Sequence, residues 1–369
     1  MIQKKVKKRV MQKSKSSPLD ISIGGIPLGQ KALLARHLAI MLKAGLSLTE
    51  SLKIVHESSK GILRKRLESI LHSVTAGRSF AESLTNHPKD FSGLFVSAVR
   101  AGEASGSLEQ NLENLAVQLE KDKELISKIK GAMLYPIIVL IATVALGLVV
   151  SFFVLPQITP LFLGMKQELP ITTRLLIQFS QLIQYSGATL ITGLVAFIIF
   201  FMWLVKQKFA KPVTHWLFLN LPVIKEMTIA ANLSRFSRTL GMLLKSGLRI
   251  DEALSIMKEI LGNVYYRRVI IELETRVTKG GTLYENLENY PKLFPIIVTH
   301  MIRVGENSGK LEETLLYLGD YYETEVDTAT KTLSTVIEPL LLIGIGCAVA
   351  FLALSIITPI YNITGGVKK

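Results

Sequence analysis

RAGEASGSLEQNL at residues 100–112 recurs as RVGENSGKLEETL at residues 303–315, an offset of 203 residues. Upstream of this motif, LKAGL at Leu42 matches LKSGL at Leu244 with an offset of 202, so one residue has been inserted between the two matches. A period of this length is too long for a solenoid repeat. The chain therefore contains two copies of a domain of about 120 residues.

The pattern of each copy predicts helices. In LLARHLAIMLKAGL, residues 33–46, the apolar residues are three and four apart, as on one face of a helix. Ser47–Glu50 and Ser79–Glu82 have the spacing of capping boxes, and the second recurs as Thr282–Glu285. No alternating strand pattern appears in either copy. We therefore expect an all-α protein in which each copy forms a bundle of about six helices.

Three long uncharged segments predict membrane helices. The chain has 369 residues, of which 49% are hydrophobic, yet no charged residue occurs in 131–165, 175–205 or 339–367. Each segment exceeds the roughly 20 apolar residues that cross a bilayer. Buried core helices are the alternative, and uncharged runs this long argue against them. The expected spans are about residues 133–155, 187–205 and 337–359.

Charge asymmetry predicts the orientation. Residues 1–130 carry 22 Lys and Arg against 12 Asp and Glu, and residues 206–332 carry 17 against 15. By the positive-inside rule both charged regions and the N-terminus are cytoplasmic, and the C-terminus is extracytoplasmic. The N-terminus has no apolar segment typical of a cleaved signal peptide. Cys347, the single cysteine, rules out a disulfide framework.

These observations give a domain plan with a basic arm at its start. The predicted parts are the arm, 1–30; a first repeat, 31–156, with a cytoplasmic bundle at 31–131; an extracytoplasmic connection, 157–186; the middle span, 187–205; a second repeat, 232–359, with a cytoplasmic bundle at 232–334; and a tail, 360–369. The arm has seven basic residues before its first acid, Asp20, and no aromatic residue for stacking on nucleic acid. Attraction to anionic lipid and a solvated tail are both open readings, and no direct nucleic-acid contact is expected.

The repeated motif predicts a tight turn between helices. We expect a helix through Arg100 to end at Gly102, and Gly102 and Gly106 to take positive φ. The expected turn also includes Ser105 and, in the second copy, Gly305, Glu306, Ser308 and Gly309. Glu103 and Glu306 are expected to accept backbone amides at the turn or to pair with Arg100 and Arg303. A divalent cation held by the two glutamates is the sharper alternative.

Small residues predict close helix packing in the membrane. Thr143 and Gly147 are four residues apart in the first span, and Gly346 and Ala350 occupy the matching positions in the third. Small residues let membrane helices approach closely. We expect these faces to pack against each other or against a partner's helix, although chance occurrence in a Gly- and Ala-rich span is an open alternative.

The sequence around the first span resembles the signature of the type II secretion F protein family. Its pattern is met by KIKGAMLYPIIVLIATVALGLVVSFFVLP, residues 128–156, which includes Lys128, Tyr135, Pro136, Val139 and Pro156. The matching residues of the second copy are Glu338, Pro339 and Pro359. The doubled GE-x-SG motif and ELPITTR at 168–174 also look like this family. The resemblance covers nearly everything after residue 30, whereas family members often carry a longer N-terminal segment.

This resemblance implies a polytopic inner-membrane platform at the centre of a pilus or secretion machine. The implied partners are a hexameric cytoplasmic ATPase, pilins or pseudopilins, other inner-membrane components of the machine, membrane lipid and further copies of the chain. The resemblance leaves secretion, twitching pilus and competence machines open.

Motifs for catalysis are missing. GGIPLGQK, residues 24–31, has the glycine spacing of a P-loop but ends in Gln-Lys where Lys-Ser or Lys-Thr is needed to reach phosphate and magnesium. The six histidines are scattered. We therefore expect no enzyme, no cofactor and no metal site. An oligomeric channel or transporter is the alternative, although three spans are few for a pore; a DNA-uptake component is another.

Overall fold

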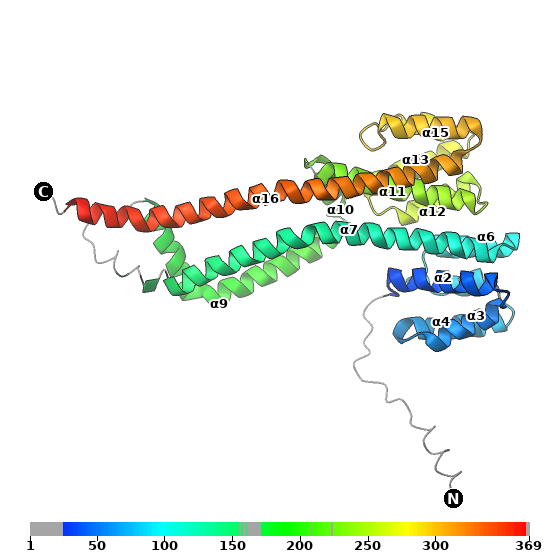
Figure 1. Ribbon diagram of the computed structural model, residues 1–369, viewed down its shortest axis with the longest axis horizontal. Helices are drawn as coiled ribbons and strands as arrows, with labels where there is room; N and C mark the ends of the chain where they lie inside the picture. Colours follow the sequence, from blue (N-terminus) through cyan, green and yellow to red (C-terminus); the bar gives the residue numbers. More distant parts are fainter. Residues whose placement is uncertain are drawn as a thin grey trace, which may run out of the picture. The chain divides into compact units, whose positions relative to one another are not determined.

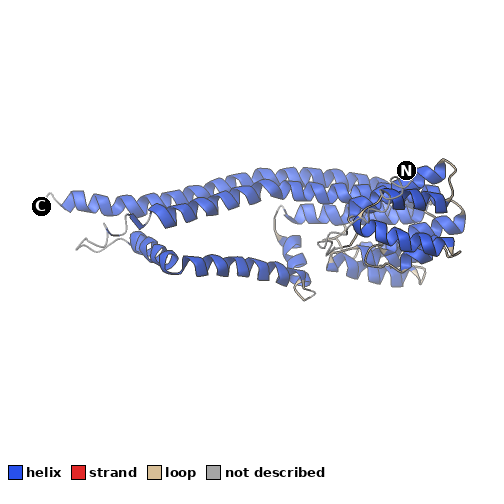
Figure 2. Ribbon diagram, turned by 90° about the horizontal axis from the view of Figure 1, so that it is seen from below, coloured by secondary structure: helices blue, strands red, loops and turns tan. Residues whose placement is uncertain are grey.

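The computed structural model describes residues 25–154, 156–157, 160, 171–207, 209–222 and 224–366. Every regular element in these ranges is helical, as Figures 1 and 2 show. The all-α fold class is therefore confirmed. Most of the predicted basic arm and part of the ELPITTR segment lie outside the described residues.

The first copy of the repeat contains the helices from α2 to α7. They are α2 (Leu28–Lys43), α3 (Leu48–Ser58), α4 (Gly61–Thr75), α5 (Phe80–Thr85), α6 (Gly93–Ser105) and α7 (Leu108–Val149), after which a π-helical turn covers Val150–Val154. The polar loops between these helices match the breaks in the apolar pattern. Asn86-His-Pro, for example, lies between α5 and α6, because proline cannot continue the ladder of helix hydrogen bonds.

The second copy repeats these helices at nearly constant offset. Its members are α11 (Ile224–Lys245), α12 (Ile250–Ile260), α13 (Val264–Val277), α14 (Leu283–Leu287), α15 (Ile296–Ser308) and α16 (Leu311–Gly366). The bounds of α15 are those of α6 shifted by 203 residues, and those of α12 are those of α3 shifted by 202. Between the copies lie α9 (Ile171–Lys206) and the short α10 (Lys211–Asn220). The duplication seen in the sequence is thus a duplication of helices.

The chain divides into two compact units whose bounds differ from those of the repeats. The first unit contains the chain up to Lys123 together with Thr239–Ile260 and Val277–Gly280. The second unit contains Glu124–Arg238, Leu261–Arg276 and Gly281 onward. Helix α12, which belongs to the second repeat by sequence, is thereby part of the first unit.

Each unit has an apolar core, and the repeat supplies matching residues to both. Phe91 and Leu112 are buried in the first unit, and their counterparts Phe294 and Leu315 are buried in the second. Phe91 packs edge-on against Phe95 with ring centroids 5.0 Å apart, whereas Phe294 packs against Phe236 and Tyr266, each at 5.3 Å. Burying one such side chain stabilises a fold by roughly 1.5–3 kcal/mol, so these rings are major contributors to both units.

Two helices are long and apolar enough to cross a membrane. They are α7, with 42 residues, and α16, whose part to Ser355 qualifies. The most apolar window of each is not buried within the chain. Helix α16 continues through Pro359 to Gly366, and the end of the third span near Pro359 stays a prediction. The predicted middle span lies in α9, which is bent at Ser186, and its place in a membrane stays a prediction.

Candidate functional site: the repeated glutamate turns and the groove along α6

The glutamate of the repeated motif binds the start of another helix. In the first unit, Oε1 of Glu103 accepts a hydrogen bond from the N–H of Phe80 at 2.6 Å, and Oε2 accepts one from Ala81 at 3.0 Å. These are amides of the first turn of α5, which have no acceptor within their own helix. The negative charge also lies at the positive end of the α5 dipole. The glutamate therefore fixes the short helix to the end of α6.

The second copy makes the same arrangement. Glu306 accepts hydrogen bonds from Leu283 at 2.7 Å and from Tyr284 at 3.0 Å, the first residues of α14. We expected acceptance of amides at the glutamate's own turn or pairing with an arginine. The amides instead belong to a helix about 23 residues upstream. Both oxygens of each carboxylate are engaged in this way, which favours the structural role of these glutamates over cation binding.

The glycines of the motif divide into two kinds, and one expectation was wrong. Gly106 and Gly309 end α6 and α15 in the left-handed region, with φ of 69° and 68°, as predicted. Gly102 and Gly305 instead lie inside helices, because α6 continues to Ser105 and α15 to Ser308. A Cβ added at Gly102 would lie 2.8 Å from Cα of Leu108. These two glycines are required by close approach to the next helix, not by positive φ.

The serines of the motif donate hydrogen bonds to carbonyl groups in the last turn of their own helices. The hydroxyl of Ser105 donates to the carbonyl of Ala101 at 2.7 Å, and that of Ser308 donates to the carbonyl of Gly305 at 3.4 Å. Upstream, Ser47 forms the full capping box and Ser79 accepts the amide of Glu82 at 3.0 Å.

The predicted box at Thr282 is not formed. This threonine has no side-chain bond to the amide of Glu285, and its buried hydroxyl has no partner within the part of the chain that the structure describes. The amides of Leu283 and Tyr284 are taken by Glu306, so α14 is capped from another helix instead of by its own N-cap residue.

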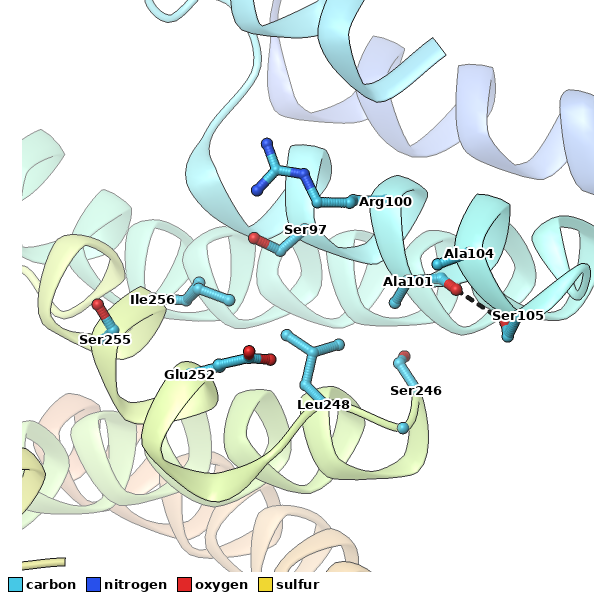
Figure 3. A pocket seen from close by; sticks show the side chains of 11 residues that line it. Ser97, Arg100, Ala101, Ala104, Ser105, Ser246, Leu248, Glu252, Ser255 and Ile256 are labelled. Atoms are coloured by element: carbon cyan, nitrogen blue, oxygen red, sulfur yellow. Dashed lines mark hydrogen bonds between the residues drawn. The ribbon is translucent and has the colours of Figure 1, made fainter. Parts of the chain in front are cut away.

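A groove of about 620 Å³ lies in the first unit, between α6 and α12 (Figure 3). Its α6 wall carries Ser97 and Arg100, and its other wall carries Leu248, Glu252 and Ile256. A second hollow of about 320 Å³ shares Ser97, Arg100 and Ile256 with it and extends toward the start of α6. The groove therefore adjoins the repeated motif, because its lining includes Arg100, Ala101 and Ser105.

Arg100 and its counterpart Arg303 have different surroundings. The guanidinium of Arg303 lies over the ring of Tyr284, 5.2 Å from the centroid. The residue matching Tyr284 in the first copy is Ala81, which offers no ring. Arg100 is exposed and makes no ion pair or ring contact with any residue that the structure describes. The first copy thus has an unpaired arginine beside the groove, whereas the matching arginine of the second copy makes a cation–π contact.

The groove combines charged and apolar side chains. Arg100 lines one wall of the groove and Glu252 the other, and Glu259 approaches the N-terminus of α6 at Gly93, where a Cβ would lie 2.8 Å from its Oε2. The apolar side chains of Leu248 and Ile256 line the same groove. No group of three or more His, Cys, Asp or Glu suited to a metal ion occurs among the described residues. Such a surface matches a peptide segment of mixed charge.

An arginine–glutamate pair also recurs in the two copies, and sequence reasoning missed it. Arg36 of α2 binds Glu120 of α7 at 2.6 Å in the first unit. Arg238 of α11 binds Glu323 of α16 at 2.5 Å in the second, where it also binds Asp320 at 2.7 Å. The recurrence of Glu120 as Glu323 was visible in the sequence, and the offset of 202 between the arginines was the signal that would have found the pair.

Lys128, the first residue of the family-like signature, joins this second cluster. Its ammonium group lies 2.9 Å from Asp327 and 3.4 Å from Glu323, both on α16. The lysine is on α7, so the contact ties the two long helices together three residues before the uncharged segment of α7 begins. Its counterpart, Lys331, lines a shallow hollow beside it.

The other signature residues lie along the two long helices. Tyr135 and Glu338 are exposed, and Pro136 is buried inside α7, which continues through it without a break. Pro339 is exposed on α16, Pro156 follows the π-helical turn, and the side chain of Pro359 lies outside the described residues.

Apart from the half-buried Thr143, the small residues predicted to pack in the membrane are not covered by any part of the chain that the structure describes. Gly147, Gly346 and Ala350 are exposed, and a Cβ added at either glycine would meet no atom within 4 Å. The hydroxyl of Thr143 donates to the carbonyl of Val139 on its own helix at 2.8 Å. Packing of these positions against a partner's helix stays a prediction.

Comparison with known proteins gives the same division of the chain. The family model described as type II secretion system (T2SS), protein F matches residues 34–156 and again residues 236–359. These two matches coincide with the two copies of the repeat.

Several curated proteins are similar over most of their length. A type IV pilus assembly protein PilC of Thermus thermophilus is 36% identical over 92% of this chain and 84% of its own. A type II secretion system protein F of Aeromonas hydrophila is 36% identical over 93% of this chain and 89% of its own. A PilC of Pseudomonas aeruginosa is 31% identical over 96% of this chain and 97% of its own.

Proposed function

The chain belongs to the type II secretion system protein F family, and on this basis we propose that it is the inner-membrane platform of a type II secretion or type IV pilus assembly machine. In this role it couples a cytoplasmic assembly ATPase to the polymerisation of pilins or pseudopilins. It acts as a scaffold that holds partners and transmits movement, and it has no catalytic role of its own.

One observation carries this proposal. Helices α7 and α16 each begin directly after the short turn that ends α6 or α15, and each runs without a break into an uncharged segment. Helix α16 is drawn as one ribbon from orange to red in Figure 1. An α-helix is stiff along its axis because each residue is bonded to the next turn. A displacement at the cytoplasmic end of such a helix is therefore transmitted to its membrane part.

The proposed topology has three membrane spans. Helices α7, α9 and α16 supply these spans. The two bundles of about six helices, which precede the spans of α7 and α16, are cytoplasmic. The C-terminus is extracytoplasmic. The support is the charge asymmetry of the sequence and the long exposed apolar surfaces, such as those of Ile141 on α7 and Leu342 on α16, which are 63% exposed in each case.

The cytoplasmic partner is proposed to contact the groove along α6. A free arginine, two carboxylates and apolar side chains along the same groove match a protein surface better than a small molecule. Pilin subunits are proposed to contact the membrane part, where Gly147 and Gly346 leave room for the backbone of a partner's helix. The same positions are suited to contact between copies of this chain in a homo-oligomer.

In-cell photo-cross-linking tests the proposal. A photoreactive residue is placed at Arg100 or at Glu252 in the groove, at Gly147 or Gly346 on the membrane helices, and at exposed Lys65 on α4 as a control. We expect the groove positions to capture a hexameric assembly ATPase and the membrane positions to capture a pilin-like protein. The control position is expected to capture neither protein.

Capture of the ATPase by Lys65 and not by the groove would place its contact elsewhere on the chain. Recovery of only lipid, DNA or copies of this chain from every position would contradict the platform function and favour a channel or a DNA-uptake component.

A further inference from the structure

Helix α10 carries an apolar stripe that the chain leaves uncovered. Phe209 just before the helix and Val213, Trp216 and Leu217 within it are 69%, 66%, 55% and 43% exposed. Their spacing of four, three and one places them on one side of a helix. No residue of α10 is buried. An exposed stripe with a tryptophan and a phenylalanine is unfavourable in water and indicates a covering surface.

The other side of α10 is hydrogen-bonded to the start of α13, which fixes the direction of the stripe. Nδ1 of His215 accepts a hydrogen bond from the N–H of Val264 at 3.1 Å, and the hydroxyl of Tyr265 donates to the carbonyl of Pro212 at 3.3 Å. Both partners are at the start of α13. His215 and Leu219, on this side, are half-buried. The apolar stripe therefore faces away from the helices that hold α10.

The position of α10 in the chain indicates what covers the stripe. It contacts α9, whose last part exposes Phe197, Ile199 and Trp203. The exposed apolar surface of α9 is thus followed directly by that of α10. Around it the sequence has Lys206, Lys208, Lys211 and Lys225, and no acidic residue occurs in 175–225. A helix with aromatic and aliphatic residues on one face and lysines around it matches an anionic membrane surface.

We propose that α10 is an interfacial helix that lies in the cytoplasmic surface of the membrane, with Phe209, Val213, Trp216 and Leu217 among the upper acyl chains and the lysines at anionic headgroups. Tryptophan is favoured at this depth because its ring is apolar and its N–H is polar. The inference rests on the proposed membrane span in α9. It adds a second lipid contact, through which the membrane surface positions α13 by way of His215 and Pro212.

Fluorescence quenching in lipid tests this inference on the full chain. The protein is reconstituted in phosphatidylglycerol-containing vesicles, and Trp203 is changed to phenylalanine so that Trp216 is the only tryptophan. Lipids brominated near the glycerol end of the acyl chain report a shallow position, and lipids brominated near the chain terminus report a deep one. Trp216 is expected to be quenched about twofold more by the shallow bromines than by the deep ones.

Two variants of the chain serve as references for the depth of Trp216, one for a position inside the membrane and one for a position in water. Both carry Trp203→Phe and Trp216→Phe, and each adds one new tryptophan. Phe197→Trp, about two and a half turns before the end of α9 at Lys206, is expected to be quenched more by the deep bromines than Trp216 is. Tyr317→Trp, at an exposed position of α16 in the predicted cytoplasmic bundle, is expected to be quenched by aqueous acrylamide and by neither lipid.

A variant of the stripe supplies the second measurement. Val213→Ser with Leu217→Ser leaves the His215 and Pro212 bonds in place and changes only exposed side chains. The Trp216 emission is expected to shift to longer wavelength, and its shallow quenching to fall about twofold, because fewer apolar groups hold the helix in the lipid.

Each other outcome is informative. If Phe197→Trp is unquenched by lipid, the span in α9 is wrong and the inference fails with it. If Phe197→Trp is quenched but Trp216 is quenched only by acrylamide, the span stands and the interfacial helix is wrong. Protection of Trp216 from both lipid and acrylamide would show that protein covers the stripe, which also overturns the proposal.

Discussion

Glu306 accepts a hydrogen bond from the backbone N–H of Leu283 at 2.7 Å. Glu103, 203 residues earlier, accepts the matching bond from Phe80 at 2.6 Å. We predict that Glu103→Gln lowers the free energy of unfolding by about 1–3 kcal/mol, because the new amide places a donor against a donor and removes the charge. Unfolding of the full chain in detergent, followed by circular dichroism, measures this. Glu82→Gln, an exposed glutamate on α5, is the control, and an equal loss there would contradict the special role of Glu103.

Gly102 lies against Leu108, and a methyl group has no room between them. We predict that Gly102→Ala destabilises the first unit by about 1–3 kcal/mol through overpacking, and that Gly102→Val lowers assembly of the machine with little loss of membrane insertion. Gly147→Ala, where nothing lies within 4 Å, is expected to leave stability unchanged. Thermal unfolding and co-purification of partners give the two readings. Equal behaviour of the two alanine variants would argue against close approach at Gly102.

Arg36 and Arg238 occupy matching positions but differ in exposure. The side chains of Arg36 and Glu120 are 26% and 45% exposed, whereas those of Arg238 and Glu323 are 10% and 11% exposed. Breaking a buried pair leaves an uncompensated charge and costs roughly 3–5 kcal/mol, whereas an exposed pair contributes about 0–1 kcal/mol. We therefore predict that Arg238→Gln is far more destabilising than Arg36→Gln. Similar denaturation midpoints for the two variants would show that burial does not separate the pairs.

Lys128 links α7 to α16 through Asp327. We predict that Lys128→Glu weakens this link by about 1 kcal/mol or more, because it places like charges together, and that adding Asp327→Lys restores it. A double-mutant cycle on detergent stability measures the coupling. Strictly additive effects of the two changes would mean that the contact contributes nothing to the fold.

His215 makes the α10 contact dependent on pH. Partial burial, together with the positive charges of Lys211 and Arg267, lowers the His215 pKa below its ordinary value of about 6.5. The folded chain thus binds fewer protons than the unfolded chain, so the stabilisation is present above that ordinary value and is lost as pH falls through the folded pKa. Protonation also replaces the acceptor of the Val264 amide with a donor.

We predict faster intrinsic-rate-corrected hydrogen exchange at the Val264 amide as pH falls from about 6.5 through the lowered pKa of His215. His215→Asn keeps an acceptor and does not titrate, so its exchange is expected to lose this pH dependence. If the asparagine variant responds to acid as the wild type does, the titrating group is another residue.

Much of the fold was predictable because its signals are local. The duplication, the helical pattern and the uncharged segments follow from residue spacing, and the ends of α6 and α15 differ from expectation by only one turn. Gly102 was given a positive φ because glycine in a short polar motif usually marks a turn. The structure shows the other reason for glycine, a close neighbour, and that neighbour is visible only once α7 has folded back beside α6.

The site was less predictable because its partners are distant in sequence. Glu103 reaches amides that any residue types would supply, so no side chain in the sequence identified them. Thr282 matched a capping pattern, yet Glu306 had already taken the amides of α14. The groove beside Arg100 depends on α12, which is contributed by the other copy of the repeat and which no local pattern assigns to α6.

The placement of α12 has a consequence for how such chains diverge and can be recombined. Because the first unit includes a helix of the second repeat, the two repeats are not structurally independent of each other. A substitution on the Arg100 face of α6 meets residues such as Leu248 and Ile256, so the two copies must accumulate compatible changes. A chimaera that exchanges one copy for that of a relative would have to carry α6 and α12 together to keep this surface intact.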